Sequence, residues 1–343
     1  MKGKLQYFNI EKLGIYLRGS SEHLFINSDE AILDSLISWF HGRPQIINTG
    51  TRKADKSKGQ SNVYCYDVDG SNGEYVFVLW NEVTNAEGEI LTLSKQSKPG
   101  DAIVKSGLDS TKSIPGLPSY YWISLNHNLV VTLHFDHALS SLVALRDYIT
   151  GYIQNYSEFA VTDEENENKV IGYRKPNDVG SMGYFKFDIK RKIDESTVQE
   201  LSQKHNLITK VVRRTKKAVE DVEYQGFFHN LASKVIQRGL PSGREVCVDI
   251  ELEFTPKSEA DFKEIVRAYR TEILDPDRHN NLGFVLRGNG SRPLFLDGQS
   301  LRSEHNFELI RDNKKPLNAA ELLEYIVRKQ VRFVPRSNSR EAA

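Results

Sequence analysis

Cysteine is scarce in this chain of 343 residues, which contains only Cys65 and Cys247. Two cysteines do not make a disulfide framework, and neither belongs to a Cys-x-x-Cys pair or to a Cys/His cluster that would hold zinc. Long apolar runs are also missing. No stretch approaches the roughly 20 residues that cross a bilayer, and the N-terminal segment lacks the apolar run of a signal peptide. These absences favour a protein of the reducing cytosol.

Motifs typical of nucleotide or acyl-transfer chemistry are absent too. The chain has no Gly-x-Gly-x-x-Gly fingerprint, no phosphate-binding P-loop and no Gly-x-Ser-x-Gly elbow. His134 and His137 could form a ligand pair, but no third ligand follows at a suitable spacing, and a metal site needs at least three. The Arg287–Arg292 segment could present backbone N–H groups to a phosphate, although a plain hairpin loop is the simpler interpretation. We therefore expect no cofactor, no bound metal and no enzymatic activity.

The apolar pattern predicts an α+β fold with two lobes, because the chain is too long for one ordinary core. We expect one lobe over residues 1–156 and another over 157–343, each a mainly antiparallel sheet with packed helices. In the first lobe, helical spacing alternates with strand-like runs joined by an Asp-Gly-Ser-Asn-Gly turn. In the second lobe we predict strands at 183–189, 207–212 and 245–254 and helices near 195–205, 227–238, 258–274 and 319–331.

Positive charge is concentrated in one segment, Lys210–Lys217, which holds five cations in eight residues and no acid. The whole chain is balanced, with 46 basic and 46 acidic residues. A local positive field in a neutral protein either serves a purpose or is balanced by a neighbour. Lys and Arg at this density attract phosphate without reading a base sequence. A solvated surface strand explains the run equally well.

We predict that this segment contacts duplex DNA through its phosphates. On a strand its cations would point to two sides, so we expect the strand to end near Arg213 and the remainder to lie in a loop. Further basic residues could extend the surface. The full predicted set is Lys210, Arg213, Arg214, Lys216, Lys217, Lys190, Arg191, Lys192, Arg52 and Lys53.

Three carboxylates, Asp249, Glu251 and Glu253, occupy alternate positions of one predicted strand and so share a face. Such a row could bind Mg²⁺ in a nuclease. The simpler interpretation is that the acids face solvent and the core face is formed by the alternate apolar residues Val248, Ile250, Leu252 and Phe254. A third possibility is a protein-interaction module that does not bind nucleic acid.

Several segments in the same order resemble RexA, the exclusion protein family of temperate phages. They are Gly116–Ile123, Leu145–Ile149, Val248–Lys257, Asp261–Val266 and Pro316–Asn318. The resemblance implies a cytosolic homodimer with two α+β lobes that binds DNA largely without sequence preference and acts in defence against phage. It also implies a membrane-protein partner. The chain is longer than the usual family member, and the basic loop at 52–58 has no counterpart there. The leading hypothesis is thus a non-enzymatic DNA-binding protein of a phage-defence system.

Overall fold

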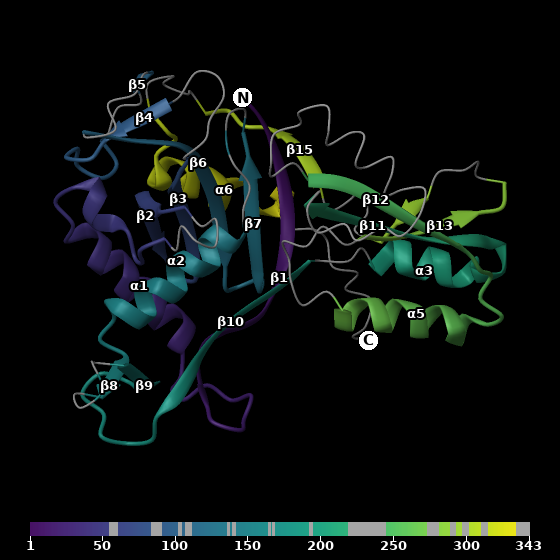
Figure 1. The fold of residues 1–343 in the computed structure, drawn as a ribbon, viewed down its shortest axis with the longest axis horizontal. Helices are drawn as coiled ribbons and strands as arrows, with labels where there is room; N and C mark the ends of the chain where they lie inside the picture. The colour runs from purple at the N-terminus through teal and green to yellow at the C-terminus, as the bar shows by residue number, and fades with distance from the viewer. Residues whose placement is uncertain are drawn as a thin grey trace. The chain divides into compact units, whose positions relative to one another are not determined.

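The computed structural model describes residues 1–54, 61–83, 91–101, 105–106, 112–135, 138, 142–163, 166, 169–191, 195–218, 245–272, 281–288, 293–296, 302–309 and 315–333. The chain forms two compact units, here called unit 1 (1–190 and 302–343) and unit 2 (191–301). Each combines a largely antiparallel sheet with packed helices, which confirms the predicted α+β class (Figure 1).

The division differs from the expected boundary between residues 156 and 157, because the chain returns to unit 1 after unit 2. Unit 1 contains β1 (Lys2–Leu17), α1 (Ser28–His41), η1 (Ile46–Thr49), β2 (Val63–Ser71), β3 (Glu74–Glu82), β4 (Leu91–Ser94), β5 (Lys105–Ser106), β6 (Ser113–Ser124), β7 (Leu129–His134), α2 (Leu142–Asn155), β8 (Ala160–Asp163), β9 (Lys169–Tyr173), β10 (Gly183–Arg191), β15 (Arg302–Asn306) and α6 (Ala319–Phe333).

The described part of unit 1 forms an eleven-stranded sheet whose main path is β2-β3-β6-β7-β1-β10-β9-β8. Strand β15 also pairs with β1, with Gln6 opposite Arg302 and Lys2 opposite Asn306. Strand β10 lies beside a later part of β1, where Lys190 Nζ is 3.1 Å from Glu11 Oε2. Both strands that connect unit 1 to unit 2 are therefore neighbours of β1.

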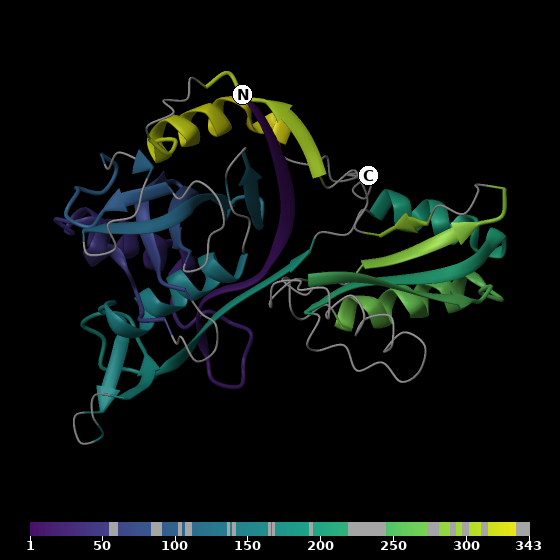
Figure 2. The same ribbon diagram turned by 45° about the horizontal axis from the view of Figure 1, so that its top comes forward.

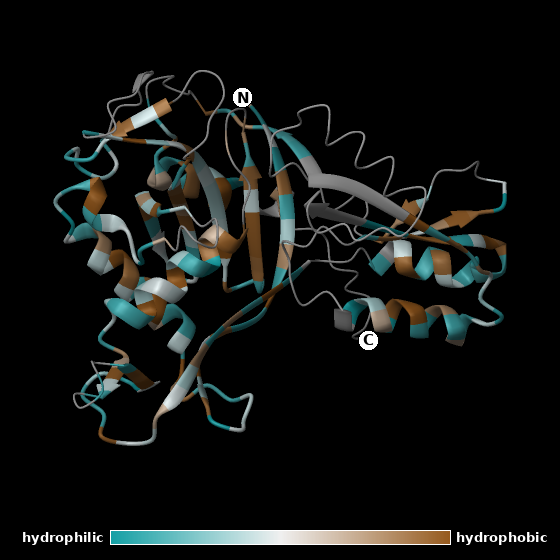
Figure 3. Cartoon of the chain, in the orientation of Figure 1, coloured by the Kyte–Doolittle hydropathy of each residue, from teal (hydrophilic) through white to brown (hydrophobic). Residues whose placement is uncertain are grey.

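Helices cover both faces of the unit 1 sheet. Along β3, Phe77 packs in the same core as α1 and α2, whereas Val78 packs in the core that contains Leu322 and Ile326 of α6. Figure 2 shows α6 on one side of the sheet and α2 on the other. Because both faces are covered, β3 is buried from Glu74 to Asn81 and β7 is hydrophobic along most of its length (Figure 3).

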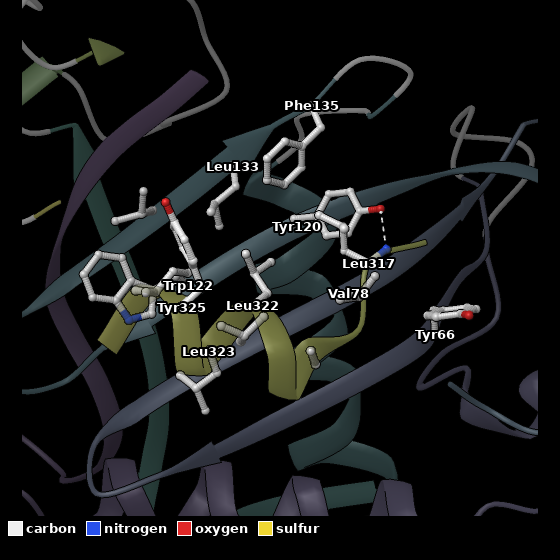
Figure 4. Close-up of a cluster of buried hydrophobic side chains, with 14 of the residues drawn as sticks. Tyr66, Val78, Tyr120, Trp122, Leu133, Phe135, Leu317, Leu322, Leu323 and Tyr325 are labelled. Carbon is white, nitrogen blue, oxygen red and sulfur yellow. Dashed lines mark hydrogen bonds between the residues drawn. The ribbon is translucent and has the colours of Figure 1, made fainter. Parts of the chain in front are cut away.

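Two hydrogen bonds fix the start of α6 on the sheet, and a third caps the helix. The Leu317 N–H donates to the Tyr120 hydroxyl at 3.2 Å (Figure 4), and the Ala319 N–H donates to Asp67 Oδ2 at 2.8 Å. Asn318 caps the helix, as its side-chain oxygen accepts the Glu321 N–H at 3.1 Å. Burial raises the pKa of Asp67, although hydrogen bonds from the Ala319 and Val68 N–H groups favour its ionised form. The predicted last helix is thus confirmed, but it completes the core of unit 1.

A buried carboxylate closes the β3–β6 edge of this core. Glu74 accepts hydrogen bonds from Trp122 Nε1 at 2.7 Å, Ser124 Oγ at 2.8 Å and Asn126 Nδ2 at 3.0 Å. Its side chain is only 9 % exposed. A buried charge is tolerated when donors surround it in this way.

Unit 2 has a four-stranded sheet in the described part, in the order β12-β11-β13-β14. Its elements are α3 (Glu195–Gln203), η3 (His205–Leu207), β11 (Ile208–Ala218), β12 (Glu245–Glu253), α5 (Glu259–Glu272), β13 (Asn281–Leu286) and β14 (Leu294–Phe295). The helix predicted at 227–238 lies outside the described residues. Both α3 and α5 pack on one face of the sheet, which we call the helix face (Figure 1).

The core of unit 2 joins that helix face to the two helices. Phe284 of β13 packs with Leu201 of α3 and with Phe262 and Val266 of α5. The other side of the sheet is here called the charged face, because Lys210, Arg214, Glu251 and Glu253 lie on it. Unit 2 thus buries one face of its sheet under helices and carries charge on the other.

Candidate nucleic-acid interface

The basic segment is strand throughout, which contradicts the expectation that the strand ends near Arg213. Strand β11 runs from Ile208 to Ala218, and β12 pairs with it in antiparallel register from Lys210 opposite Glu253 to Ala218 opposite Glu245. Arg214 to Lys217 are therefore not in a loop. The backbone hydrogen bonds of the ladder stabilise an extended conformation that the side-chain pattern alone does not indicate.

The cations of β11 divide between the two faces of the sheet. Val211 and Arg213 lie on the helix face, opposite Phe284 and Leu282 of the core. Lys210 and Arg214 lie on the charged face, where the Arg214 guanidinium sits 4.5 Å from the centre of the Phe295 ring. Lys216 and Lys217 continue the ladder, and their side chains are outside the described part. A single ligand can thus contact only part of the cluster.

Carboxylates of β12 lie beside these cations. Lys210 Nζ is 3.0 Å from Glu251 Oε2, and this hydrogen-bonded pair raises the pKa of Lys210. In the ladder, Lys210 is opposite Glu253 and Arg214 is opposite Asp249. Residues 191–301 hold 18 Lys and Arg against 17 Asp and Glu. The positive segment is therefore largely balanced by its neighbouring strand, and its long-range field is weaker than its sequence indicates.

A hollow of about 460 Å³ in unit 2 contains the predicted residue Lys210 and a second cation, Arg287, that was not in the predicted set. Lys210 and Arg287 line it with Thr209, Glu251 and Val285. Arg287 is exposed and follows Val285 on the charged face, and the Glu251 carboxylate beside it reduces the attraction for an anion. Arg287 was predicted only as part of a glycine-rich loop. Nothing in the sequence singles out Phe295, because β14 has only two residues.

The other predicted cations belong mostly to unit 1. Arg52 forms an ion pair with Asp147, Lys190 forms one with Glu11, and Lys53 is exposed. The side chains of Arg191 and Lys192 lie outside the described part. Exposed ion pairs of this kind contribute little to stability, so they do not prevent a phosphate contact. The structure places five residues of the predicted set on β11, and Lys190 and Arg191 at the end of β10.

The apolar residues between the carboxylates of β12 do not form a core face, which contradicts the simpler interpretation of that strand. Ile250 is 57 % exposed, Leu252 is 61 % exposed and Phe254 is 39 % exposed. The reason is that β12 is the last strand of the described sheet, while the core under α3 and α5 is built on β11 and β13. Glu251 and Glu253 are exposed as predicted, and the side chain of Asp249 is not described.

The described residues contain no group of three or more His, Cys, Asp or Glu side chains that could hold a metal ion. Within the same ranges, no helix is both long and apolar enough to span a bilayer. Comparisons with protein-family models, curated proteins and solved structures found no match for the chain.

Proposed function

We propose that this protein binds nucleic acid through its phosphates and without sequence preference, with β11 as the principal contact. The observation that carries the proposal is the concentration of Lys210, Arg213, Arg214, Lys216 and Lys217 on one strand. Phosphate contacts need only cations within reach of the backbone, and they require no pocket and no base-reading side chain.

The neighbouring carboxylates limit how strong this binding is. Each cation that stays paired with β12 releases no counterion from DNA, and Lys210 already contacts Glu251. We therefore expect about two or three phosphate contacts, which corresponds to a log–log salt slope of about −2 to −3. Binding should then be weak at physiological salt and clear at about 50 mM.

The wider biological setting rests on the resemblance to the phage-exclusion family. It supports a cytoplasmic homodimer that acts in defence against phage, together with a membrane-protein partner. The homodimer, the role in defence and the membrane-protein partner are part of the proposal, but phosphate binding does not depend on them. The same resemblance favours duplex DNA as the nucleic acid.

A gel-shift or fluorescence-anisotropy titration against salt tests the proposal. The variant in which Arg213, Arg214, Lys216 and Lys217 are changed to Ala should lose most of its affinity for a duplex and flatten the salt slope by about one to two. Far-UV circular dichroism and a urea unfolding curve establish that this variant is folded.

A matched control removes the same charge from the same unit. Lys204, Lys257, Lys263 and Arg267 are exposed on the described surface of unit 2 and lie outside β11. Changing these four to Ala should alter affinity much less. Equal losses in the two variants would show that net charge matters and that the strand does not.

A Mg²⁺-dependent nuclease remains the second candidate, because Asp249, Glu251 and Glu253 alternate along β12. Successive same-face residues of a strand are about 6.6 Å apart, so only a converging set of side chains could share one ion. Incubation with plasmid in the presence of Mg²⁺ or EDTA separates the two functions. Cutting that needs the metal and is lost in Glu251→Gln would replace phosphate binding as the primary activity.

A further inference from the structure

Strand β12 is unusually long for an edge strand. It is nine residues long and is the terminal strand of the described sheet, pairing there only with β11. Alternate N–H and C=O groups of such a strand point away from its neighbour and can pair with another chain. Natural edges are usually shortened, covered or interrupted to prevent this.

The helix-face side of this edge carries an apolar row. Ile250 and Leu252 are 57 % and 61 % exposed, and Phe254 continues the row at 39 %. Leu252 is opposite Val211, a partly buried neighbour of the unit 2 core, so the row extends that core outward by one strand. Exposed branched side chains next to a core mark a surface that another apolar segment can cover.

The charged-face side of the same edge carries carboxylates. Glu251 is half exposed and has Lys210 on its inner side. Glu253 is exposed and lies opposite Lys210 in the ladder. An incoming strand would bring its own alternate side chains alongside these two residues.

A second copy of β12 fits this edge poorly. Antiparallel self-pairing centred on Glu251 would place that carboxylate beside its own copy and Asp249 beside Glu253. Like charges directly opposite each other destabilise a strand pair. A strand that alternates cations with apolar residues, by contrast, matches both rows at once. The inner neighbour β11 supplies the same chemistry, with Val211 against Leu252 and Lys210 against Glu251.

We propose that the outer edge of β12 captures an extended segment of a partner protein in which basic residues alternate with apolar ones. The segment adds a fifth strand to the described sheet of unit 2. Its cations pair with Glu251 and Glu253, and its apolar side chains cover Ile250 and Leu252. This is recognition by strand addition, in which the backbone gives affinity and the two rows give specificity. It is independent of nucleic-acid binding.

Fluorescence anisotropy on the full chain tests the proposal with a labelled synthetic peptide of about eight residues in which Lys alternates with Val. Two further peptides separate the contributions: one replaces every Val with Gly, and the other replaces every Lys with Glu. We expect binding of the Lys–Val peptide alone. Equal binding of the Lys–Gly peptide would show simple charge attraction and overturn strand addition.

Substitutions on the edge locate the binding site. Leu252→Lys removes an exposed apolar contact and adds a repelling charge, so the Lys–Val peptide should bind at least about tenfold more weakly. Glu253→Lys should weaken it as well through the other face. The matched control is Ile171→Lys, which alters a 42 %-exposed Ile on strand β9 of unit 1 and should leave binding unchanged.

These results distinguish a partner segment from a second copy of the chain at the β12 edge. Unchanged affinity in both edge variants, with circular dichroism confirming that they are folded, would place the peptide elsewhere and reject the proposal. Sedimentation of the free protein addresses the second copy. A dimer that becomes a monomer in Leu252→Lys, together with no peptide binding, would assign the edge to self-association.

Discussion

The two sheets of the molecule differ in how far a strand rich in apolar residues is buried. In unit 1, β3 is buried on both faces, with α1 and α2 on one side and α6 on the other. In unit 2, β12 alternates apolar and acidic residues and is exposed at Ile250 and Leu252. The difference indicates that β3 is packed on both faces, while β12 leaves Ile250 and Leu252 exposed in the described part of unit 2.

Carboxylates show the same contrast. Glu74 in unit 1 is buried and accepts hydrogen bonds from three side chains, including the Trp122 indole. In unit 2, Glu251 is half exposed and pairs with a single lysine. Removing a partner from a buried charge costs far more than removing one from an exposed pair, because only the buried group loses solvation. The comparison can be tested at both sites.

The largest effect should come from the helix that completes unit 1. Leu322 of α6 is fully buried, so Leu322→Ala should lower the free energy of unfolding by about 2–5 kcal/mol in urea or guanidinium titrations. Val327 on the same helix is 45 % exposed, and Val327→Ala should change the free energy of unfolding by about 0.5 kcal/mol or less. Similar values for both variants would show that α6 does not pack on this sheet in solution.

The buried carboxylate should give the next effect. Glu74→Gln replaces an oxygen acceptor with a donor next to the Trp122 and Ser124 donors, so the free energy of unfolding should fall by about 1.5–3 kcal/mol. Glu253→Gln, on the exposed edge of unit 2, should shift it by about 0.5 kcal/mol or less. Equal losses would remove the distinction between the two units.

Asp67 gives unit 1 a dependence on pH. Burial raises the pKa of Asp67 in the folded protein above its unfolded value near 4. At a pH between these two pKa values, the folded state holds a proton that the unfolded state has lost. Its contribution to stability is therefore full below about pH 4 and is lost as pH rises through the folded pKa. Urea midpoints of the wild type and of Asp67→Asn, measured across this window, should diverge as pH rises, because only the wild type loses stability. Parallel curves would contradict the raised pKa.

The smallest effect concerns the balance of charge in unit 2. Glu251→Gln releases Lys210 from its ion pair, so duplex affinity should rise about two- to fivefold at low salt. The free energy of unfolding should change little. A titration of the variant at two salt concentrations measures both the affinity and the slope. Weaker binding would mean that the carboxylate assists the ligand, as a metal-dependent site would require.

Much of the fold follows from the sequence, because the spacing of apolar residues indicates whether a segment forms a helix or a strand. The helices around Phe262 and Leu322 were both predicted from the sequence, at 258–274 and 319–331, and they are confirmed. Periodicity does not reveal which sheet an apolar face will cover. The last helix was therefore assigned to the second lobe, although Leu322 belongs to the core of unit 1.

The candidate site was less predictable for a related reason. Arg214 to Lys217 have no alternating apolar residues, so their extended conformation depends on the partner strand β12, which is distant in sequence. The acids that balance the basic strand were visible in the sequence, but their register was not. The ladder between β11 and β12, with Lys210 opposite Glu253 and Arg214 opposite Asp249, shows that the two charged segments are neighbours.

The position of unit 2 in the chain has a consequence for its independence. The chain leaves unit 1 at the end of β10, near Glu11 of β1, and returns at the start of β15, opposite Gln6. These two positions on β1 are five residues apart, or about 17 Å along an extended strand. A linker of about six residues from Lys190 to Arg302 could span that gap. Unit 2 is thus an insertion into an otherwise continuous sheet, and it could be excised, exchanged or acquired as a module while unit 1 keeps its core.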